Sequence, residues 1–169
     1  LDIVRHIGVK GKVPVGLFSL EMSKEQLVDR LLCSEANVDL WRMRTGRLSE
    51  RPEDDDFPRI GHAMGVLSEA PIFIDDASNN NIMQIRTKAR RLQMEHGLGL
   101  IVIDYLQLME SRGNIENRVQ EVAEITRGLK SIARELNIPV LALSQLSRTV
   151  EASTPAIPIL SHLRESGSI

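Results

Sequence analysis

The sequence predicts an α/β fold built around a mostly parallel β-sheet. Short apolar segments typical of buried strands alternate along the chain with segments whose apolar residues recur at helical spacing. The 169 residues fit one domain and are enough to bury a real core. The sequence contains no internal repeat and no low-complexity stretch, so the alternation itself is the main guide to the architecture.

The amino-terminal part of the sequence predicts one strand and two helices. Residues Val13–Leu20 form an apolar run followed by polar residues, which indicates a buried strand. Ser23–Gln26 (SKEQ) fits a capping box, so a helix is expected to begin there, with Leu27 and Leu31 on its apolar face. A second, short helix is expected over Val38–Arg44.

The middle of the sequence predicts a second strand and a longer helix. The polar and acidic segment Gly46–Pro58 contains two prolines and indicates a loop or the start of a helix. The strand is expected over Pro71–Ile74, ending in an aspartate pair. Helical spacing predicts a helix over Asn81–His96, and Gly97 ends it.

The last part of the sequence contains the most apolar strand and the clearest helix. The strand is expected within Leu98–Leu108, followed by a polar loop over Met109–Asn117. A long apolar stripe predicts a helix over Val119–Leu136, and Val140–Gln145 follows as another buried strand. From Ser147 onward the pattern breaks into Ser, Thr and Pro.

Polar side chains stand where the expected strands end, which is where parallel sheets bind ligands. Asp104 follows four apolar residues, and a carboxylate in this place is suited to hold the Mg²⁺ of a nucleoside triphosphate. Turn capping is the alternative role, and Asp75 makes the same pattern. Glu21 is a candidate base for an attacking water, or simply an exposed turn residue. Gln145 is suited to sense a terminal phosphate, or is a polar residue that leaves the core.

A basic cluster on the helix expected over residues 81–96 also has two interpretations. It comprises Arg86, Lys88, Arg90 and Arg91. A phosphate-binding face is one interpretation. A solvated face whose charges stabilise the carboxyl end of the helix is the interpretation we favour.

Composition excludes several classes of protein. The formal net charge is −2 and aromatic residues make up 3%, so neither a strongly basic nucleic-acid binder nor a base-stacking platform is indicated. Cys33 is the only cysteine and the four histidines lack ligand spacing, which argues against a disulfide framework and a zinc site. No apolar run approaches the roughly 18 residues of a membrane span. A reducing, cytoplasmic setting is therefore expected.

Five segments together resemble the successive motifs of the DnaB family of replicative DNA helicases. Their order and intervals match those of the family, and the resemblance covers nearly the whole chain. The segments are FSLEMSKEQL (Phe18–Leu27), RTGRL (Arg44–Leu48), EHGLGLIVIDYLQLM (Glu95–Met109), ARELNIPVLALSQLSR (Ala133–Arg148) and LRESGSI (Leu163–Ile169).

The resemblance implies a RecA-like P-loop NTPase core and a role for each strand-end residue. Glu21 corresponds to the catalytic glutamate that activates water. Asp104 corresponds to the Walker B aspartate, which acts through Mg²⁺, and this favours Asp104 over Asp75. Gln145 corresponds to the residue that couples the γ-phosphate state to the DNA loops.

The resemblance also implies where single-stranded DNA binds. The polar loop Ser111–Arg118, with Arg112 and Arg118, corresponds to a loop that faces the central channel of a ring. Arg164, Glu165 and Gly167 correspond to a segment that grips the phosphates of the strand. Contacts to the backbone suit a translocating motor, because such a motor must not depend on base sequence.

The activity implied by the resemblance is ATP hydrolysis coupled to 5′-to-3′ movement on one strand and to duplex unwinding during DNA replication. The cofactors are ATP and Mg²⁺. The working form is a homohexamer with nucleotide at its subunit interfaces. A primase and a helicase loader are the expected partners, as in a primosome.

Two departures from the family pattern limit what residues 1–169 are expected to do alone. The sequence contains no GxxxxGK[ST] phosphate loop, and the GVKGK segment at Gly8–Lys12 lacks both the preceding strand and the following Ser or Thr. There is no initiator Met, and Ile169 falls within a motif. We therefore expect a partial ATPase domain, truncated at both ends, with an exposed sheet edge and negligible ATP hydrolysis by itself.

Two alternatives remain open at this point. A RecA-like relative of recombinase or clock type is opposed by the SLEM and RESGS segments. A degenerate, non-catalytic module for DNA binding or ring interaction is favoured by the missing phosphate loop. The presence of Glu21, Asp104 and Gln145 together opposes this second alternative.

Overall fold

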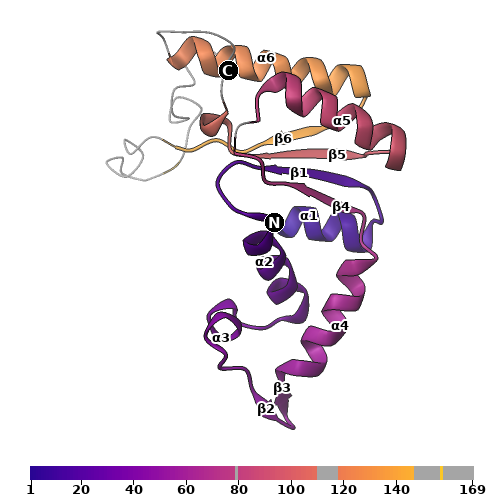
Figure 1. Cartoon of the computed structure of the whole chain (residues 1–169), viewed down its shortest axis with the longest axis vertical. Helices are drawn as coiled ribbons and strands as arrows, with labels where there is room; N and C mark the ends of the chain where they lie inside the picture. The colour runs from indigo at the N-terminus through magenta and orange to yellow at the C-terminus, as the bar shows by residue number, and fades with distance from the viewer. Residues whose placement is uncertain (79, 110–117, 147–156, 158–169) are drawn as a thin grey trace.

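The computed structural model describes residues 1–78, 80–109, 118–146 and 157. Helices and strands alternate along the chain, as the sequence predicts (Figure 1). The elements are α1 (Asp2–Arg5), the π-helical η1 (His6–Lys10), β1 (Val15–Ser19), α2 (Lys24–Ala36), α3 (Leu40–Thr45), β2 (Glu50–Arg51), β3 (Asp54–Asp55), α4 (Asp56–Ser68), β4 (Ile72–Asp75), α5 (Ile82–His96), β5 (Leu100–Asp104), the 3₁₀ turn η2 (Leu106–Leu108), α6 (Arg118–Leu136) and β6 (Val140–Ala142).

The main sheet is parallel and has the strand order β4-β1-β5-β6. All four of its strands lie within segments predicted to be strands, apart from the last residue of β4. The central pair is β1 and β5, in register from Val15 opposite Leu100 to Ser19 opposite Asp104. Because the strands are parallel, their carboxyl ends meet at one edge of the sheet, which we call the carboxyl edge.

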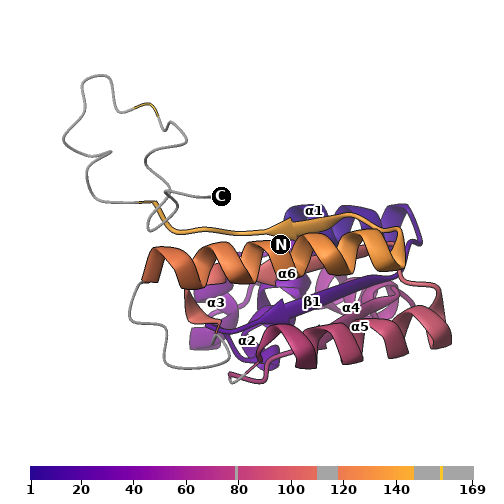
Figure 2. The same ribbon diagram turned by 90° about the horizontal axis from the view of Figure 1, so that it is seen from above.

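Helices cover both faces of this sheet, with α5 and α6 on one face and α1 and α2 on the other (Figures 1 and 2). The strands are apolar on both sides, as parallel strands buried by helices must be. Alternate residues enter two separate clusters. One cluster contains Phe18, Ile101 and Ile103 with residues of α5 and α6. The other contains Leu17, Leu100 and Val102 with Val4 and Leu27.

Capping boxes mark the starts of two predicted helices, α2 and α5. Ser23 accepts a hydrogen bond from the Gln26 N–H and Gln26 bonds back to Ser23, which completes the expected capping box of α2. Asn81 and Gln84 form a second capping box at the start of α5. Gly97 ends α5 with φ of 69°, a left-handed conformation that costs glycine little.

The prediction for Gly46–Pro58 was incomplete, because the segment contains more regular structure than its composition indicates. Glu50–Arg51 and Asp54–Asp55 pair as a short antiparallel hairpin. The helix α4 begins at Asp56 and continues to Ser68, and its extent was missed. Pro58 does not interrupt α4, because it lies in the first turn, where a helix needs no backbone N–H donor.

The strand predicted over Val140–Gln145 is shorter in the structure. Regular pairing ends at Ala142, after which Leu143 donates to Ile103 O and accepts from Leu106 N. In the described sheet β6 forms an edge, where Leu141 is partly exposed. A hollow lined by both apolar and polar residues lies between β6 and α6. The expected loop Met109–Asn117 lies outside the described residues except for the buried Met109, and Ser147 onward lies outside except for residue 157.

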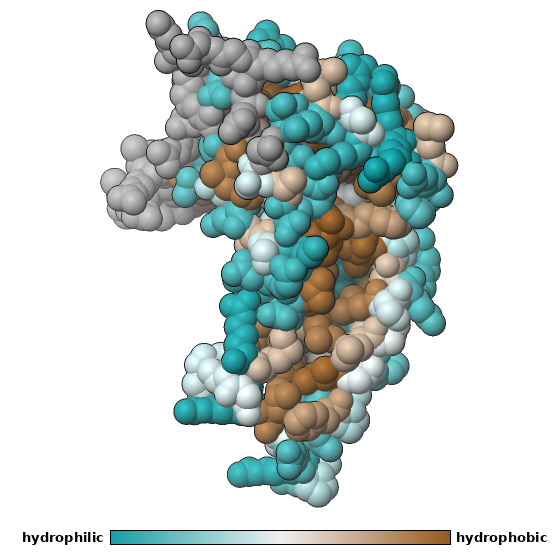
Figure 3. Space-filling model, in the orientation of Figure 1, coloured by the Kyte–Doolittle hydropathy of each residue, from teal (hydrophilic) through white to brown (hydrophobic). Residues whose placement is uncertain are grey.

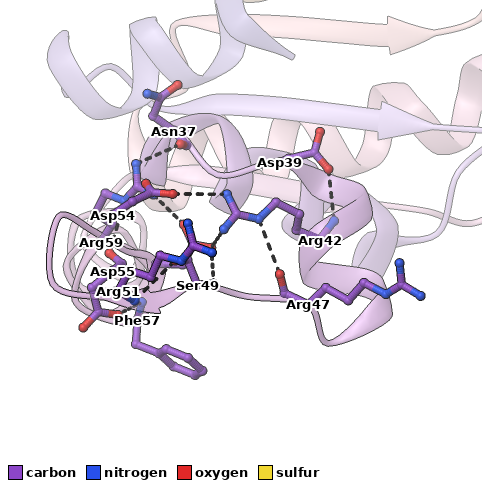
Figure 4. Close-up of polar contacts among 11 residues, drawn as sticks. Asn37, Asp39, Arg42, Arg47, Ser49, Arg51, Asp54, Asp55, Phe57 and Arg59 are labelled. Carbon is purple, nitrogen blue, oxygen red and sulfur yellow. Dashed lines mark hydrogen bonds and ion pairs between the residues drawn. The ribbon is translucent and has the colours of Figure 1, made fainter.

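A distal lobe, formed by α3, β2, β3 and α4, extends away from the sheet (Figure 1). Apolar surface gathers over α2 and α4 on the face seen in Figure 3. The lobe has a small apolar cluster that includes Val38 and Ala63, and it also buries a charge. The carboxylate of Asp56 is fully buried and accepts from Ser49 N at 2.8 Å, and it pairs with Arg42 at 2.9 Å and with Arg59. Figure 4 shows these three partners, Ser49, Arg42 and Arg59, gathered in the lobe.

The Asp56 pairing predicts an acid-sensitive distal lobe. The hydrogen bond from Ser49 N and the nearby Arg59 and Arg42 hold the pKa of Asp56 below its ordinary value, although burial opposes this. Because the pKa of Asp56 is lower in the folded than in the unfolded protein, its ionised carboxylate stabilises the fold above the ordinary Asp pKa of about 3.9. This stabilisation is lost as the pH falls through the pKa of Asp56 in the folded protein. Asp56→Asn should lower the melting temperature at pH 7, and its difference from wild type should shrink below about pH 4.

Thermal unfolding followed by circular dichroism over a pH series measures this effect. Asp54→Asn is the matched control, because Asp54 contacts the same arginines but is half-exposed. Equal losses for the two variants, or a difference that does not depend on pH, would contradict the assigned role of Asp56.

Candidate active site

The register of β1 and β5 brings the segments of Glu21 and Asp104 to the same edge of the sheet. Ser19 and Asp104 are opposite each other on the two strands. Immediately beyond this pair, Leu20 N donates to Asp104 O at 2.8 Å. The sequence prediction that both acids follow buried strands is therefore confirmed, and the structure adds that these strands are neighbours.

The turn that carries Glu21 is held on both sides, while the Glu21 side chain is exposed. The buried Ser19 hydroxyl accepts from Met22 N at 3.1 Å and donates to Met22 O at 2.8 Å. On the other side, Lys24 N donates to Asp76 Oδ2 at 2.9 Å, which anchors the first turn of α2. A fixed backbone and an exposed carboxylate suit a group that acts on a bound ligand.

The Asp104 carboxylate is half-buried at the end of β5. It makes no hydrogen bond or ion pair with another residue in the described part of the chain. Asp104 lines a surface hollow together with Met22 and Leu27. Because the carboxylate oxygens have no such partner, they are free to accept hydrogen bonds from a ligand or from metal-bound water. The peptide bond that follows Asp104, to Tyr105, is cis.

Gln145 follows β6 on the same edge, and its side chain is exposed. Its backbone N–H donates to Gln107 Oε1 at 3.2 Å, and Gln107 Nε2 donates to Ser144 Oγ at 2.8 Å. Gln107 therefore connects the segment after Asp104 to the segment after β6. Gln107 was not among the residues predicted from the sequence, although a polar side chain within the otherwise apolar YLQL segment was the available signal.

Asp75, the acid that the pattern alone left equivalent to Asp104, has a different environment. Its carboxylate contacts Lys88 Nζ at 2.7 Å and accepts from Asn80 Nδ2 at 2.8 Å and Ala77 N at 3.2 Å. Burial acts to raise the pKa of Asp75, but the hydrogen bonds from Lys88 and Asn80 outweigh it, so the pKa is lowered. Asp75 therefore stabilises the packing of the end of β4 against α5 through its pairing with Lys88.

The basic cluster on α5 is paired with acids, which supports the interpretation as a solvated helix face. Arg86 and Arg90 both pair with Glu135 of α6, with Arg86 Nε at 2.7 Å. The hydrogen bonds from Arg86 and Arg90 lower the pKa of Glu135. Lys88 pairs with Asp75, and Arg91 lies 4.0 Å from Glu95.

The GVKGK segment, Gly8–Lys12, resembles part of a phosphate loop in sequence but lies away from the candidate site residues. Gly8 and Lys10 belong to η1, and Lys12 leads directly into β1. This places Gly8–Lys12 at the amino end of β1, opposite the carboxyl edge. The expectation that GVKGK is not the phosphate loop of this site is consistent with that position.

The residues predicted to bind DNA lie outside the described part of the chain. Arg112, Arg164, Glu165 and Gly167 are not described, and Arg118 is described only as the first residue of α6, without its side chain. Their roles remain predictions from the resemblance.

The described residues contain no group of three or more His, Cys, Asp or Glu side chains that could hold a metal ion. A single free carboxylate such as Asp104 fits a Mg²⁺ ion that is held mainly by a nucleotide and by water, because Mg²⁺ keeps several waters and few protein ligands. Among the described residues, no helix combines the length and apolar content needed to cross a membrane.

A parallel sheet covered by helices, with acidic and amide side chains at its carboxyl edge, belongs to the class of α/β proteins that bind ligands at this edge. All of residues 1–169 match the family described as "DnaB-like helicase C terminal domain", and the chain belongs to this family. Membership implies nucleotide binding.

Relatives with similar sequences are named as replicative helicases. The chain is 56% identical to "Replicative DNA helicase DnaB" of a Nostoc species, covering 100% of this chain and 19% of the relative. It is 52% identical to the protein of the same name from Geobacillus stearothermophilus, covering 100% of this chain and 37% of the relative. The chain therefore spans well under half the length of these relatives.

Solved structures share the fold. "The Structure Of A DnaB-Like Replicative Helicase And Its Interactions With Primase" matches with a TM-score of 0.88 and 34% identity, covering 95% of this chain and 38% of the other. A second solved structure, described as an ATPase domain, matches with a TM-score of 0.89 and 33% identity, covering 97% of this chain and 57% of the other. The predicted RecA-like core is thereby confirmed.

The different environments of Asp75 and Asp104 predict different effects of the same substitution on stability. Asp75→Asn should destabilise the fold by about 1–2 kcal/mol, because it weakens a partly exposed, charge-assisted network. Asp104→Asn should leave the free energy of unfolding near wild type, because it breaks no such network. Urea denaturation of both variants tests this pair of outcomes, and a larger loss for Asp104→Asn would overturn the assignment.

Proposed function

We propose that the chain is part of the ATPase motor of a replicative DNA helicase, which couples ATP hydrolysis to translocation on single-stranded DNA and to duplex unwinding during replication. One observation carries the proposal: the segments of Glu21, Asp104 and Gln145 lie side by side at the carboxyl edge. The names of the relatives support the same activity. The non-catalytic alternative is not favoured, since those relatives are named helicases.

The proposal gives each strand-end residue a separate task. The exposed Glu21 carboxylate takes a proton from the attacking water, and its fixed turn keeps that carboxylate beside the nucleotide. Asp104 would hold Mg²⁺ through its bound water, and the ion would supply positive charge against the charge that develops on the phosphates. Gln145 responds to the terminal phosphate at the beginning of the segment that leads toward the proposed DNA-binding residues.

The proposed partners follow from the family. Single-stranded DNA is bound by Arg112, Arg118, Arg164, Glu165 and Gly167, and nucleotide lies at the subunit interfaces of a homohexamer. A primase and a loader join this ring in the cytoplasm. Support for a primase partner comes from the solved helicase whose interactions with primase are described.

Glu21→Gln tests the catalytic assignment in the full-length protein encoded by the gene that contains this sequence. The amide keeps the size of the side chain but cannot accept the proton, so hydrolysis should fall by about 10²–10⁴. Nucleotide affinity, measured by fluorescence titration, should stay near wild type.

Glu25→Gln is the matched control for Glu21→Gln. Glu25 lies in the first turn of α2, and its side chain is exposed. This control should hydrolyse ATP at nearly the wild-type rate. A Glu21→Gln variant that keeps wild-type turnover would remove Glu21 from the proposed role.

The polypeptide of residues 1–169 alone should hydrolyse ATP at the background rate. The reason is chemical: its sequence has no phosphate loop to stabilise the charge that develops during phosphoryl transfer. Phosphate release measured with and without single-stranded DNA tests this. A rate near that of a full-length relative would show that these residues need no such loop.

A further inference from the structure

The Gln107 side chain joins two segments that leave neighbouring strands at the carboxyl edge. Gln107 lies in η2, just after Asp104 and β5. Its Nε2 donates to Ser144 Oγ at 2.8 Å, and its Oε1 accepts from Gln145 N at 3.2 Å. One amide thus contacts the residue proposed to sense phosphate and the residue that precedes it.

Backbone hydrogen bonds lead up to this side-chain bridge. Regular pairing of β5 with β6 ends at Ile103 opposite Ala142. Beyond that point, Leu143 N donates to Ile103 O at 2.9 Å and Leu106 N donates to Leu143 O at 3.0 Å. The Gln107 amide extends the connection from Leu143 to Gln145, where the β5–β6 ladder no longer holds the backbone.

The chemistry of the bridge is specific to a side chain with two polar atoms at its end. A primary amide offers a donor and an acceptor at a fixed separation, and both are used here. The Gln107 side chain is half-buried, so water does not fully compensate for the two bonds when the bridge is lost. An apolar side chain of equal length could fill the space but could make neither bond.

We propose that Gln107 is a positioning residue that fixes the backbone of Gln145 relative to Asp104, and thereby couples events at the nucleotide to the segment that follows Gln145. The inference rests on the proposed ATPase function. Gln107 acts through Gln145 and Ser144, not by contact with nucleotide. Its loss should leave nucleotide binding largely intact and should reduce the acceleration of hydrolysis by DNA.

Three variants of the full-length protein test this role. Gln107→Met keeps the length of the side chain and removes both hydrogen bonds. Gln107→Glu keeps an acceptor for Gln145 N, and the Ser144 hydroxyl can turn to donate to the second oxygen. Gln93→Met is the matched control, because the Gln93 side-chain oxygen on α5 has no hydrogen-bond partner among the described residues.

The measurements are kcat and KM for ATP, with and without a polythymidine single strand, together with the melting temperature. Gln107→Met should lower the DNA-stimulated kcat about tenfold, which corresponds to about 1.4 kcal/mol, while KM changes less than about twofold. Its DNA-independent rate should fall less than its DNA-stimulated rate, so that the ratio of the two rates falls. Gln107→Glu should recover most of the stimulation, and Gln93→Met should resemble wild type.

The outcomes separate this inference from the function on which it rests. A wild-type protein without DNA-stimulated ATPase activity would overturn the proposed function itself. If wild type is stimulated and Gln107→Met keeps the same ratio of rates with and without DNA, the positioning role is wrong. A parallel fall of both rates together with the melting temperature would make Gln107 a structural residue and would also overturn the inference.

Discussion

The hydrogen-bonded register of β1 and β5 determines where the candidate catalytic groups of this molecule lie. Ser19 faces Asp104 across the two strands, and Leu20 N bonds to Asp104 O just beyond them. A slip of one residue would exchange the two faces of a strand, placing Phe18 among the partners of Leu17. The separate apolar clusters on the two faces therefore fix the register of β1 and β5. The register in turn fixes the relative positions of the segments that carry Glu21 and Asp104.

Much of the sheet could be predicted from the sequence because its signals are local. Apolar runs and capping residues such as Ser23 and Asn81 act within a few positions of the chain. The distinction between Asp75 and Asp104 was not predictable in this way, because both follow an apolar strand. It depends on Lys88, which α5 brings back to Asp75 from a distant part of the sequence.

The features that the sequence analysis missed depend on contacts between distant residues. The segment Gly46–Pro58 looked irregular because it is polar, yet its Asp56 is buried by the pairing with Arg42 and Arg59. Gln107 looked like one polar residue in an apolar segment, and its partners Ser144 and Gln145 follow a different strand. In both cases the role of the polar residue depends on the distant residues that the fold brings into contact with it.

The clamp between α5 and α6 has a mechanical consequence. Glu135 of α6 binds both Arg86 and Arg90 of α5, and a Cβ at Gly128 would lie 2.8 Å from Ile82 Cγ2, so the two helices are closely apposed. Lys88 ties the same helix to the end of β4. Helices joined at several points resist sliding past each other. A displacement of the strand ends would therefore move α5 and α6 together as one rigid body.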